Sequence, residues 1–366
     1  MNNEQLKNIV SHFHVQGEVK SINPLGNGLI NDTFKVETVA AETPDYVLQR
    51  INNAIFTDVE QLQRNIQLVT THIRKKLETQ GVEDLGRRVL NFIEADNGKT
   101  YWKDKEDKYW RISTFIPDAL TFETVNAEYS YAAGLAFGEF EAALVDLPAD
   151  LGETIPDFHN MEFRMKQLHE AVENNAVNRV EEVKDLLKEI EDNAAEMCKA
   201  EQLHREGKLP KRICHCDTKV NNMMFDKEGN ILCVIDLDTV MPSYIFSDYG
   251  DFLRTAANFT AEDDPDMSKV GFNEKIFQAF TKGYLKSASS FLQPIEIENL
   301  PYAVALFPFM QCVRFLADYI NGDVYFKTKY ATHNLDRANN QMELFKSVCK
   351  HSESMKAFIQ ECINNK

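Results

Sequence analysis

The sequence has little positive charge and no hydrophobic run long enough to span a membrane. Its 40 Lys and Arg residues are outnumbered by 57 Asp and Glu residues, which gives a formal net charge of −17. Such a charge disfavours duplex nucleic acid and anionic membrane surfaces as partners, because both repel an acidic protein. The longest nearly apolar run, Tyr302 to Val313, is shorter than the about 20 residues of a membrane-spanning helix. No membrane span is therefore predicted.

Cysteine is absent from the first half of the chain, and the seven cysteines of the second half are scattered between Cys198 and Cys362. This is not the arrangement of a disulfide framework, and it favours reduced thiols. The N-terminal segment also lacks the basic stretch and apolar core of a secretory signal, so a cytoplasmic location is expected. With 366 residues, the chain is long enough for two domains.

The first third of the chain alternates apolar and polar residues in the manner of an antiparallel sheet. One helical pattern interrupts the strands and begins at Asp58, which is a plausible helix N-cap. After Pro117 the pattern changes to long helices. The predicted strands span 18–23, 32–38, 46–52, 88–92, 101–103 and 108–115.

The helical part is predicted to include helices over 128–144 and 161–205 and to resume at 248, with Pro301 and Pro308 breaking the last pattern. A loop over 212–217 and a hairpin over 223–238 interrupt it once. The fold class expected is α+β, with two lobes of the protein-kinase type. The N-terminal nucleotide-binding lobe spans 1–117, the hinge lies at about 114–118, and the C-terminal lobe with catalysis and the acceptor site spans 118–366.

The hairpin region carries the most specific pattern, His215, Asp217, Lys219 and Asn222 in the order His-x-Asp-x-Lys-x-x-Asn, before an apolar strand that ends at Asp236. Phosphoryl-transfer enzymes of the protein-kinase type use this spacing. Their chemistry needs a carboxylate to accept a hydroxyl proton and oxygen ligands to hold Mg²⁺ against the triphosphate of ATP. Asp217 is therefore predicted to be the base, Lys219 to lie near the γ-phosphate, and Asn222 and Asp236 to bind Mg²⁺.

A glycine-bearing turn at 26–28 separates the first two predicted strands, and its backbone N–H groups can approach phosphate oxygens. Alone, such a turn is weak evidence, and a tight turn without a ligand is the simpler interpretation. Because the same chain also carries the catalytic-loop pattern, this turn becomes a candidate nucleotide lid. The backbone of the hinge is expected to meet adenine. The candidate nucleotide-binding residues here are Gly26, Gly28, Asn31, Thr33, Phe115 and Ile116.

Four segments, 28–34, 46–52, 215–222 and 313–319, carry a resemblance to a known family. The whole chain resembles the aminoglycoside phosphotransferase and choline kinase group, which has a two-lobed protein-kinase-like fold. Within that group it is most similar to the N-acetylhexosamine 1-kinases, which phosphorylate the anomeric hydroxyl of GlcNAc or GalNAc. The resemblance implies Mg·ATP as the phosphoryl donor, and it implies that Asp238, Thr239 and Arg314 lie near the sugar.

One position departs from the kinase pattern. Kinases normally place on their third strand a lysine that holds the α- and β-phosphates, and here Gln49 occupies that place. Arg50 is the candidate replacement. Strand alternation turns Arg50 to the opposite face, so it can serve only if the strand is bulged or shifted.

Arg314 lies in an otherwise apolar stretch, with Asp318 one helical turn later on the same face. Two interpretations remain open for Arg314: an internal ion pair with Asp318, or a guanidinium that donates hydrogen bonds to sugar hydroxyls.

The function favoured by the sequence is phosphorylation of an N-acetylhexosamine by Mg·ATP. An amino-alcohol, homoserine or aminoglycoside kinase is the alternative, and ATP and a small sugar or amino-alcohol acceptor are the expected partners. A catalytically dead binding module is suggested by Gln49 but opposed by the intact Asp217. A zinc or redox site at Cys214 and Cys216 is disfavoured because the chain has no CxxC pair. The pattern does not indicate an oligomeric state.

Overall fold

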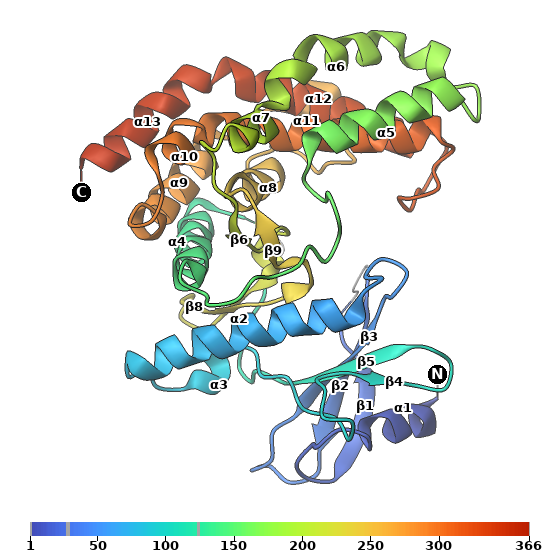
Figure 1. Cartoon of the computed structure of the whole chain (residues 1–366), viewed down its shortest axis with the longest axis vertical. Helices are drawn as coiled ribbons and strands as arrows, with labels where there is room; N and C mark the ends of the chain where they lie inside the picture. Colours follow the sequence, from blue (N-terminus) through green and yellow to red (C-terminus); the bar gives the residue numbers. More distant parts are fainter. Residues whose placement is uncertain (1, 27–29, 123–124, 366) are drawn as a thin grey trace. The chain divides into compact units, whose positions relative to one another are not determined.

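The computed structural model describes residues 2–26, 30–122 and 125–365 (Figure 1). Gly28, a candidate nucleotide ligand, lies outside the described residues. The chain forms two compact units. Unit 1 comprises Met1–Thr121, Asp146–Pro156 and Met223–Met241, and unit 2 comprises Phe122–Val145, Asp157–Asn222 and Pro242–Lys366. The lobe boundary near Pro117 stays a prediction.

Unit 1 is built on a five-stranded antiparallel sheet in the order β1-β2-β3-β5-β4. The predicted N-cap of the long helix is confirmed, because the Asp58 side chain accepts a hydrogen bond from the backbone N–H of Gln61 at 2.9 Å. The elements of unit 1 are α1 (Asn3–Val10), β1 (Val19–Pro24), β2 (Asp32–Thr38), β3 (Tyr46–Ile51), α2 (Val59–Thr79), α3 (Leu85–Arg88), β4 (Trp102–Lys103), β5 (Tyr109–Thr114), β7 (Met223–Phe225) and β8 (Ile231–Val234).

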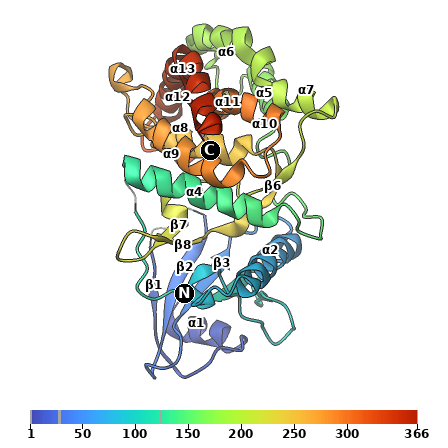
Figure 2. The same ribbon diagram turned by 90° about the vertical axis from the view of Figure 1, so that its left-hand side faces the viewer.

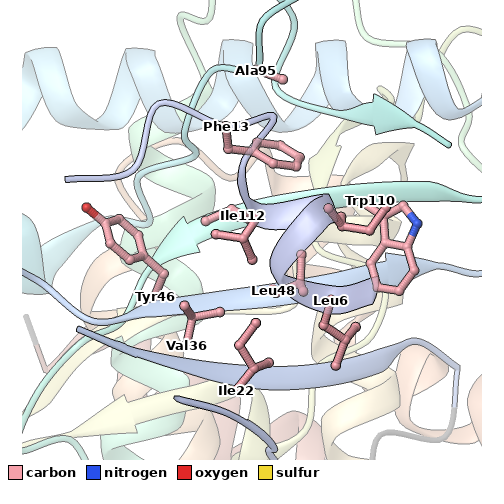
Figure 3. Packing of buried hydrophobic residues seen from close by; sticks show 11 residues of the cluster. Leu6, Phe13, Ile22, Val36, Tyr46, Leu48, Ala95, Trp110 and Ile112 are labelled. Atoms are coloured by element: carbon pink, nitrogen blue, oxygen red, sulfur yellow. The ribbon is translucent and has the colours of Figure 1, made fainter. Parts of the chain in front are cut away.

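The apolar face of the sheet is covered by α1 (Figure 3). Leu6 of α1 packs with Leu48 of β3 and with Ile112 and Trp110 of β5, and each of these side chains is buried. Burying one such side chain contributes about 1.5–3 kcal/mol. Because side chains alternate along a strand, the opposite face of the sheet carries Arg111 between Trp110 and Ile112. The core therefore fixes which face of β5 is polar.

A hairpin of β7 and β8 also belongs to unit 1. Met223 pairs with Val234, so the end of β8 lies beside the start of β7. Ile116, just after the sheet, is buried in a small apolar cluster with Leu232 and Cys233 of β8. The segment in which the hinge is predicted therefore packs against the hairpin.

Unit 2 is helical, apart from a two-stranded sheet of β6 and β9. Helices α4 and α9 pack closely along their length (Figure 2). A Cβ atom added at Gly134 of α4 would lie 2.1 Å from the carbonyl oxygen of Phe280 in α9, so only glycine allows this approach. Its elements are α4 (Ala127–Leu144), α5 (Met161–Asn174), α6 (Lys184–Met197), α7 (Lys199–Arg205), β6 (Arg212–Cys214), β9 (Met241–Ser243), α8 (Phe246–Ala256), α9 (Glu274–Ala288), α10 (Pro294–Glu298), α11 (Leu300–Ile320), α12 (His333–Lys350) and α13 (Ser352–Asn364).

Three expectations about helices and strands were wrong. The predicted strand at 88–92 forms only an isolated bridge from Phe92 to Ser113, because its first residue, Arg88, belongs to α3 and the Val89 N–H bonds back to Leu85. The helical pattern over 161–205 is divided into α5, α6 and α7, and α5 ends where Asn175 adopts a left-handed conformation with φ 39°. Pro308 lies inside α11 without ending it. Burial on nearly all sides holds that helix together despite the missing N–H group.

Among the described helices, α11 alone is long and apolar enough to cross a membrane. Within its most apolar window, 89% of the residues are buried inside the structure. Burial of this extent is what a core helix shows.

Candidate active site

The predicted catalytic loop is held in unit 2 by one buried aspartate of α8. The Asp248 carboxylate accepts hydrogen bonds from the backbone N–H groups of His215 and Cys216, each at 2.7 Å. The hydroxyl of Thr218 donates to the backbone carbonyl of Asp248 at 2.8 Å. The His215 ring is fully buried, and Phe137 meets it edge-on. These contacts fix the loop on both sides of Cys216, which adopts a left-handed conformation with φ 63°.

Asp217, Lys219 and Asn222 are brought together on this loop. The Lys219 Nζ atom lies 2.5 Å from Asp217 Oδ1. The Asn222 amide nitrogen donates to the Asp217 carbonyl oxygen at 2.8 Å and lies 3.4 Å from Asp217 Oδ2. The Asp217 side chain is partly exposed, at 22%. The predicted base therefore sits in a fixed and accessible carboxylate geometry.

A second acid of α8, Asp251, lies close to this group. Although burial acts to lower the pKa of Lys219, the charges of Asp217 and Asp251 raise it. The pKa of Asp251 is raised by its burial and by Asp217, against the opposing effect of Arg254, whose Nε atom donates to it at 3.2 Å. Arg254 also donates to Glu262 at 2.8 Å. Lys219 is thus held in its charged form.

Beneath the catalytic loop, Glu141, Cys214 and Asp248 place three ligand atoms within 4.8 Å of one another, all buried. The Tyr284 hydroxyl donates to Glu141 at 2.5 Å. Burial and the Asp248 charge raise the pKa of Glu141 well above its usual range, so this carboxyl stays protonated. Burial also raises the pKa of the Cys214 thiol. A protonated carboxyl and a thiol are poor metal ligands, so the cluster is a structural support for the loop.

In unit 1, a second polar network lies on the face of the sheet opposite α1. Arg111 Nη1 lies 2.5 Å from Asp238 Oδ1, and Arg111 Nε donates to the Gln49 side chain at 2.9 Å. The Asn31 amide donates to Asp238 Oδ2 at 2.7 Å, and Gln49 donates to the Thr33 hydroxyl at 3.2 Å. The side chains of Arg111 and Asp238 are 3% and 5% exposed. Two nucleotide-binding candidates, Asn31 and Thr33, and one substrate-binding candidate, Asp238, therefore share one network.

Arg50 is not part of this network. Residues 32–36 pair in order with residues 46–50, and β3 pairs with β5 in order through Arg50. The bulge or shift on which its prediction as the replacement cation depended is therefore absent from these described strands. The Arg50 guanidinium instead forms an ion pair with Asp32 at the surface. The buried cation beside Gln49 is Arg111, which the sequence-based prediction missed.

Asp236 and Thr239 lie in unit 1 at a tight turn. Asp236 follows β8 with φ 60° and precedes the 3-10 turn Leu237–Thr239, termed η3, in which Thr239 is buried. The chemistry of the donor set fits Mg²⁺, which prefers oxygen ligands, since Asp236 carries a carboxylate and Asn222 an amide. In unit 2, Asn222 uses its amide nitrogen for Asp217, which leaves its carbonyl oxygen as the end that can meet a cation.

The remaining nucleotide-binding candidates lie around the sheet. Gly26 has φ 70° and open space around its Cβ position. The backbone N–H of Phe115 donates to the Asp45 carbonyl at 2.9 Å. The Lys35 Nζ atom lies over the Phe115 ring, 4.7 Å from the ring centre. Ile116 is buried, as described above. Their roles as nucleotide ligands stay predictions.

Arg314, in unit 2, lies between two aromatic rings. Its guanidinium carbon is 5.4 Å from the centre of the Phe158 ring and 5.6 Å from that of Phe326. Its Nη1 atom donates to Gln311 at 3.1 Å. Among the described residues it forms no ion pair with Asp318, so that interpretation was wrong. The reason is that Asp318 already accepts hydrogen bonds from three backbone N–H groups of the loop that follows α11 and from the Asn334 amide of α12.

Two further arginines act on the same surroundings as Arg314: Arg164, and Arg254, which is paired with Asp251 and Glu262. Burial and, next, the charge of Arg314 together lower the pKa of Arg164 to about 10, against smaller opposing effects. Burial and the charges of Arg314, Arg164 and Arg254 lower the pKa of His159 well below its usual range. His159 therefore stays neutral, stacked on Phe158.

The residues that sequence reasoning missed share one feature. Asp248 and Asp251 are acids in a buried helix, and Arg111 is a strongly basic residue in a strand of the sheet core. A buried charge needs a partner, so each of these three residues indicates a buried polar network around it. The alternation of Arg111 with Trp110 and Ile112 already placed it on the polar face of β5.

Solved structures share this fold at low identity. An amicoumacin kinase in complex with AMP-PNP and Ca²⁺ is 15% identical, with 93% of this chain and 92% of that chain covered and a TM-score of 0.57. An aminoglycoside phosphotransferase from Alicyclobacillus acidocaldarius is 11% identical, with 98% and 96% covered and a TM-score of 0.57. A choline/ethanolamine kinase family protein from Mesorhizobium loti is 15% identical, with 97% and 98% covered and a TM-score of 0.57.

These likenesses show the fold, which is the expected protein-kinase-like one with an N-terminal antiparallel sheet and a larger helical part. A family model extends the similarity to sequence. The model for the APH phosphotransferase enzyme family matches residues 21–284, which is more than half of the chain and includes the catalytic loop. The chain therefore belongs to the phosphotransferase enzyme family.

Proposed function

We propose that this phosphotransferase transfers the γ-phosphoryl group of Mg·ATP to the anomeric hydroxyl of an N-acetylhexosamine, GlcNAc or GalNAc. The observation that carries the proposal is the geometry of Asp217. Its carboxylate is ion-paired to Lys219 at 2.5 Å and held by Asn222, on a loop that Asp248 fixes through two backbone N–H groups. A fixed, accessible carboxylate beside a retained cation is what transfer to a hydroxyl needs.

In this proposal Asp217 accepts the proton of the acceptor hydroxyl as the hydroxyl oxygen bonds to the γ-phosphorus. The bond between that phosphorus and the β–γ bridging oxygen breaks, and ADP leaves with the electron pair. Lys219 keeps its charge because Asp217 and Asp251 raise its pKa, so it can stabilise negative charge on the transferring group. Positioning and charge stabilisation account for most of catalysis in this chemistry.

Mg²⁺ is proposed to be held by Asn222 and Asp236, and it would neutralise charge on the phosphates. The register of the hairpin supports the assignment. Asn222 directly precedes Met223, which pairs with Val234, and Asp236 follows Val234 by two residues. The nucleotide is proposed to lie along Gly26, Asn31, Thr33 and the backbone of Phe115 and Ile116. Such sites are common along glycine-bearing turns at strand ends.

For the acceptor, we propose that Arg314 donates hydrogen bonds to the sugar, and Thr239 is kept as a second candidate for contact with the sugar. The rings of Phe158 and Phe326 both contact its guanidinium, which restricts where its donors can point. The charges of Arg314, Arg164 and Arg254 all act on His159. Arg254 is paired with Asp251 and Glu262, but Arg314 and Arg164 form no ion pair among the described residues. These two charges disfavour a positively charged acceptor, so they favour a neutral sugar over an amino-alcohol or an aminoglycoside.

The test is a panel of acceptors incubated with Mg·ATP, with the products resolved by phosphorus NMR. GlcNAc, GalNAc, ethanolamine, homoserine and an aminoglycoside form the panel, and an Asp217→Asn variant is the matched control. Sugar 1-phosphate formed by the wild type and lost in the variant supports the proposal. Phosphorylation of ethanolamine or homoserine alone would move the function to the alternative class, and ATP binding without turnover on any acceptor would indicate a binding module.

A further inference from the structure

The polar network of unit 1 contains a cation that no step of the proposed reaction uses. Arg111 lies on β5 directly opposite Gln49 of β3, the position at which kinases carry their phosphate-binding lysine. Its Nε atom donates to Gln49 and its Nη1 atom contacts Asp238, and its guanidinium lies over the Phe92 ring at 5.6 Å. With a side chain 3% exposed, Arg111 is committed to protein partners. A direct contact with phosphate is therefore disfavoured.

Asp238, the partner of Arg111, lies in η3 directly after Asp236 and Leu237. Both of its carboxylate oxygens are used, one by Arg111 and the other by Asn31. Asn31 in turn accepts a hydrogen bond from the backbone N–H of Asn52 at 3.0 Å. The turn is thus tied to three strands of the sheet or to their ends, which fixes η3 relative to the nucleotide-binding face.

Asp236 adopts a left-handed conformation with φ 60°. This conformation is strained for a residue with a side chain, so it persists only where surrounding contacts over-determine it. The charged anchor of Asp238 stands two residues away and supplies such a contact. Partners that orient a metal-binding carboxylate without touching the metal commonly affect metal affinity.

We infer that Arg111 is a positioning residue for Asp236 and acts through Asp238. In this role the cation of the nucleotide-binding sheet orients the metal ligand and does not contact the phosphates. The inference rests on the proposed function in one respect, the assignment of Mg²⁺ to Asp236. It also changes the role of Asp238, whose carboxylate has both oxygens engaged and anchors η3 instead of contacting the sugar.

The test measures ATP affinity by calorimetry with excess Mg²⁺ and with EDTA, so that no acceptor or turnover is needed. Arg111→Met leaves Asp238 as a buried unpaired charge and is expected to unfold easily. The decisive protein is therefore the double variant Arg111→Met with Asp238→Leu, which removes both charges, and Arg111→Lys is the conservative variant. Lys103→Met is the matched control, since Lys103 lies on the same sheet and pairs with Asp107 at the surface.

We expect the double variant to fold and to bind ATP in EDTA as the wild type does. The increase in ATP affinity that Mg²⁺ causes should be about 10- to 100-fold smaller in the variant than in the wild type. Arg111→Lys should recover part of that gain, and Lys103→Met should keep all of it. Hydrogen exchange of the backbone over residues 235–240 should be faster in the double variant than in the wild type.

Three results would overturn the inference. An equal loss of ATP affinity with and without Mg²⁺ would show that Arg111 contacts the phosphates. An unchanged Mg²⁺ effect in the folded double variant would show that the pair is only structural. Wild-type protein whose ATP affinity does not respond to Mg²⁺ would overturn the metal assignment itself, and with it both the proposed function and this inference. The first two results would leave the proposed function standing.

Discussion

Arg314 and Asp318 lie one turn apart on α11 but serve different neighbours. Asp318 accepts hydrogen bonds from the backbone N–H groups of residues 324–326 at 2.8–2.9 Å and from the Asn334 amide at 2.9 Å. Arg314 stacks on Phe326 of the same loop. The aspartate therefore fixes the loop, and the loop carries a ring that holds the arginine.

Replacing Arg314 by Met removes its donors and keeps most of the stem between Phe158 and Phe326. Losing a hydrogen bond from a charged donor costs about 1.5–3 kcal/mol, so kcat/KM for the sugar should fall roughly 10- to 150-fold. ATP affinity and melting temperature should change little, because the thioether also packs well against aromatic rings. Lys286→Met, which removes a cation stacked on Tyr131, is the control and should leave the kinetics unchanged. Unaltered sugar kinetics in Arg314→Met would exclude Arg314 from the acceptor site.

The main effect of Asp318→Asn should be a loss of stability. The amide retains a single acceptor oxygen and turns an NH₂ group toward backbone donors, so about 3 kcal/mol or more of stability should be lost. A lower melting temperature with a raised KM for the sugar and an unchanged KM for ATP is the expected pattern. Asp336→Asn, at an exposed hydrogen bond with Thr332, is the control. A melting temperature equal to that of the wild type would contradict the role given to Asp318.

Local sequence signals predicted most elements of unit 1. The capping at Asp58 and the strand at 32–38 followed from patterns within a few residues, and both are present. The strand predicted at 88–92 failed over most of its length because α3 takes up Arg88 and the Val89 N–H, which leaves only Phe92 in a bridge with Ser113. Pro308 failed as a helix breaker because tertiary burial outweighs one lost hydrogen bond.

The residues of the candidate site also differ in whether a local sequence pattern could identify them. Asp217, Lys219 and Asn222 are neighbours in sequence, so one motif located all three. Arg111 and Asp238 are 127 residues apart, and their contact depends on sheet register and on the turn after β8. Pairings of this kind are set by the whole fold and leave no local pattern, although a charged residue in a buried strand indicates that a partner exists.

Asp217→Asn and Asp236→Ala should separate the base from the metal ligand. Asp217→Asn removes the proton acceptor, so turnover should be lost while ATP affinity in Mg²⁺ is retained. Asp236→Ala removes a proposed Mg²⁺ ligand, so it should weaken both nucleotide binding and turnover. Calorimetry with Mg·ATP and initial-rate kinetics on both variants provide the comparison. Identical nucleotide affinities in the two variants at all Mg²⁺ concentrations would show that this division of roles is wrong.

Gly134→Ala should destabilise unit 2 through a backbone clash. The new Cβ atom would lie 2.1 Å from the Phe280 carbonyl oxygen and 2.7 Å from the Tyr284 nitrogen, so α4 and α9 must separate. Overpacking of this kind costs about 1–3 kcal/mol, and the upper end is expected because both obstacles are backbone atoms. Gly86→Ala in α3 is the control, with open space at its Cβ position, and should change stability by less than about 1 kcal/mol. Equal urea midpoints for the two variants would argue against the close approach.

Glu201→Gln should flatten the dependence of stability on pH. Burial raises the pKa of Glu201 from its ordinary 4.5 to about 7, and only the hydrogen bond from the Met161 N–H, at 2.8 Å, and smaller effects oppose it. Between these two values the folded protein keeps a proton that the unfolded chain has released. The free energy of unfolding therefore falls as pH rises through this window, by up to about 3 kcal/mol.

The glutamine variant cannot ionise, so its stability relative to the wild type should increase from about pH 4.5 to about pH 7 and then level off. Denaturant unfolding of both proteins across this range measures the difference. Glu173→Gln, at an exposed position of α5, should instead give a constant difference. If the curves of Glu201→Gln and wild type run parallel, then Glu201 is ionised in the folded protein throughout, and its burial must be compensated by a cation or a donor beyond the Met161 N–H.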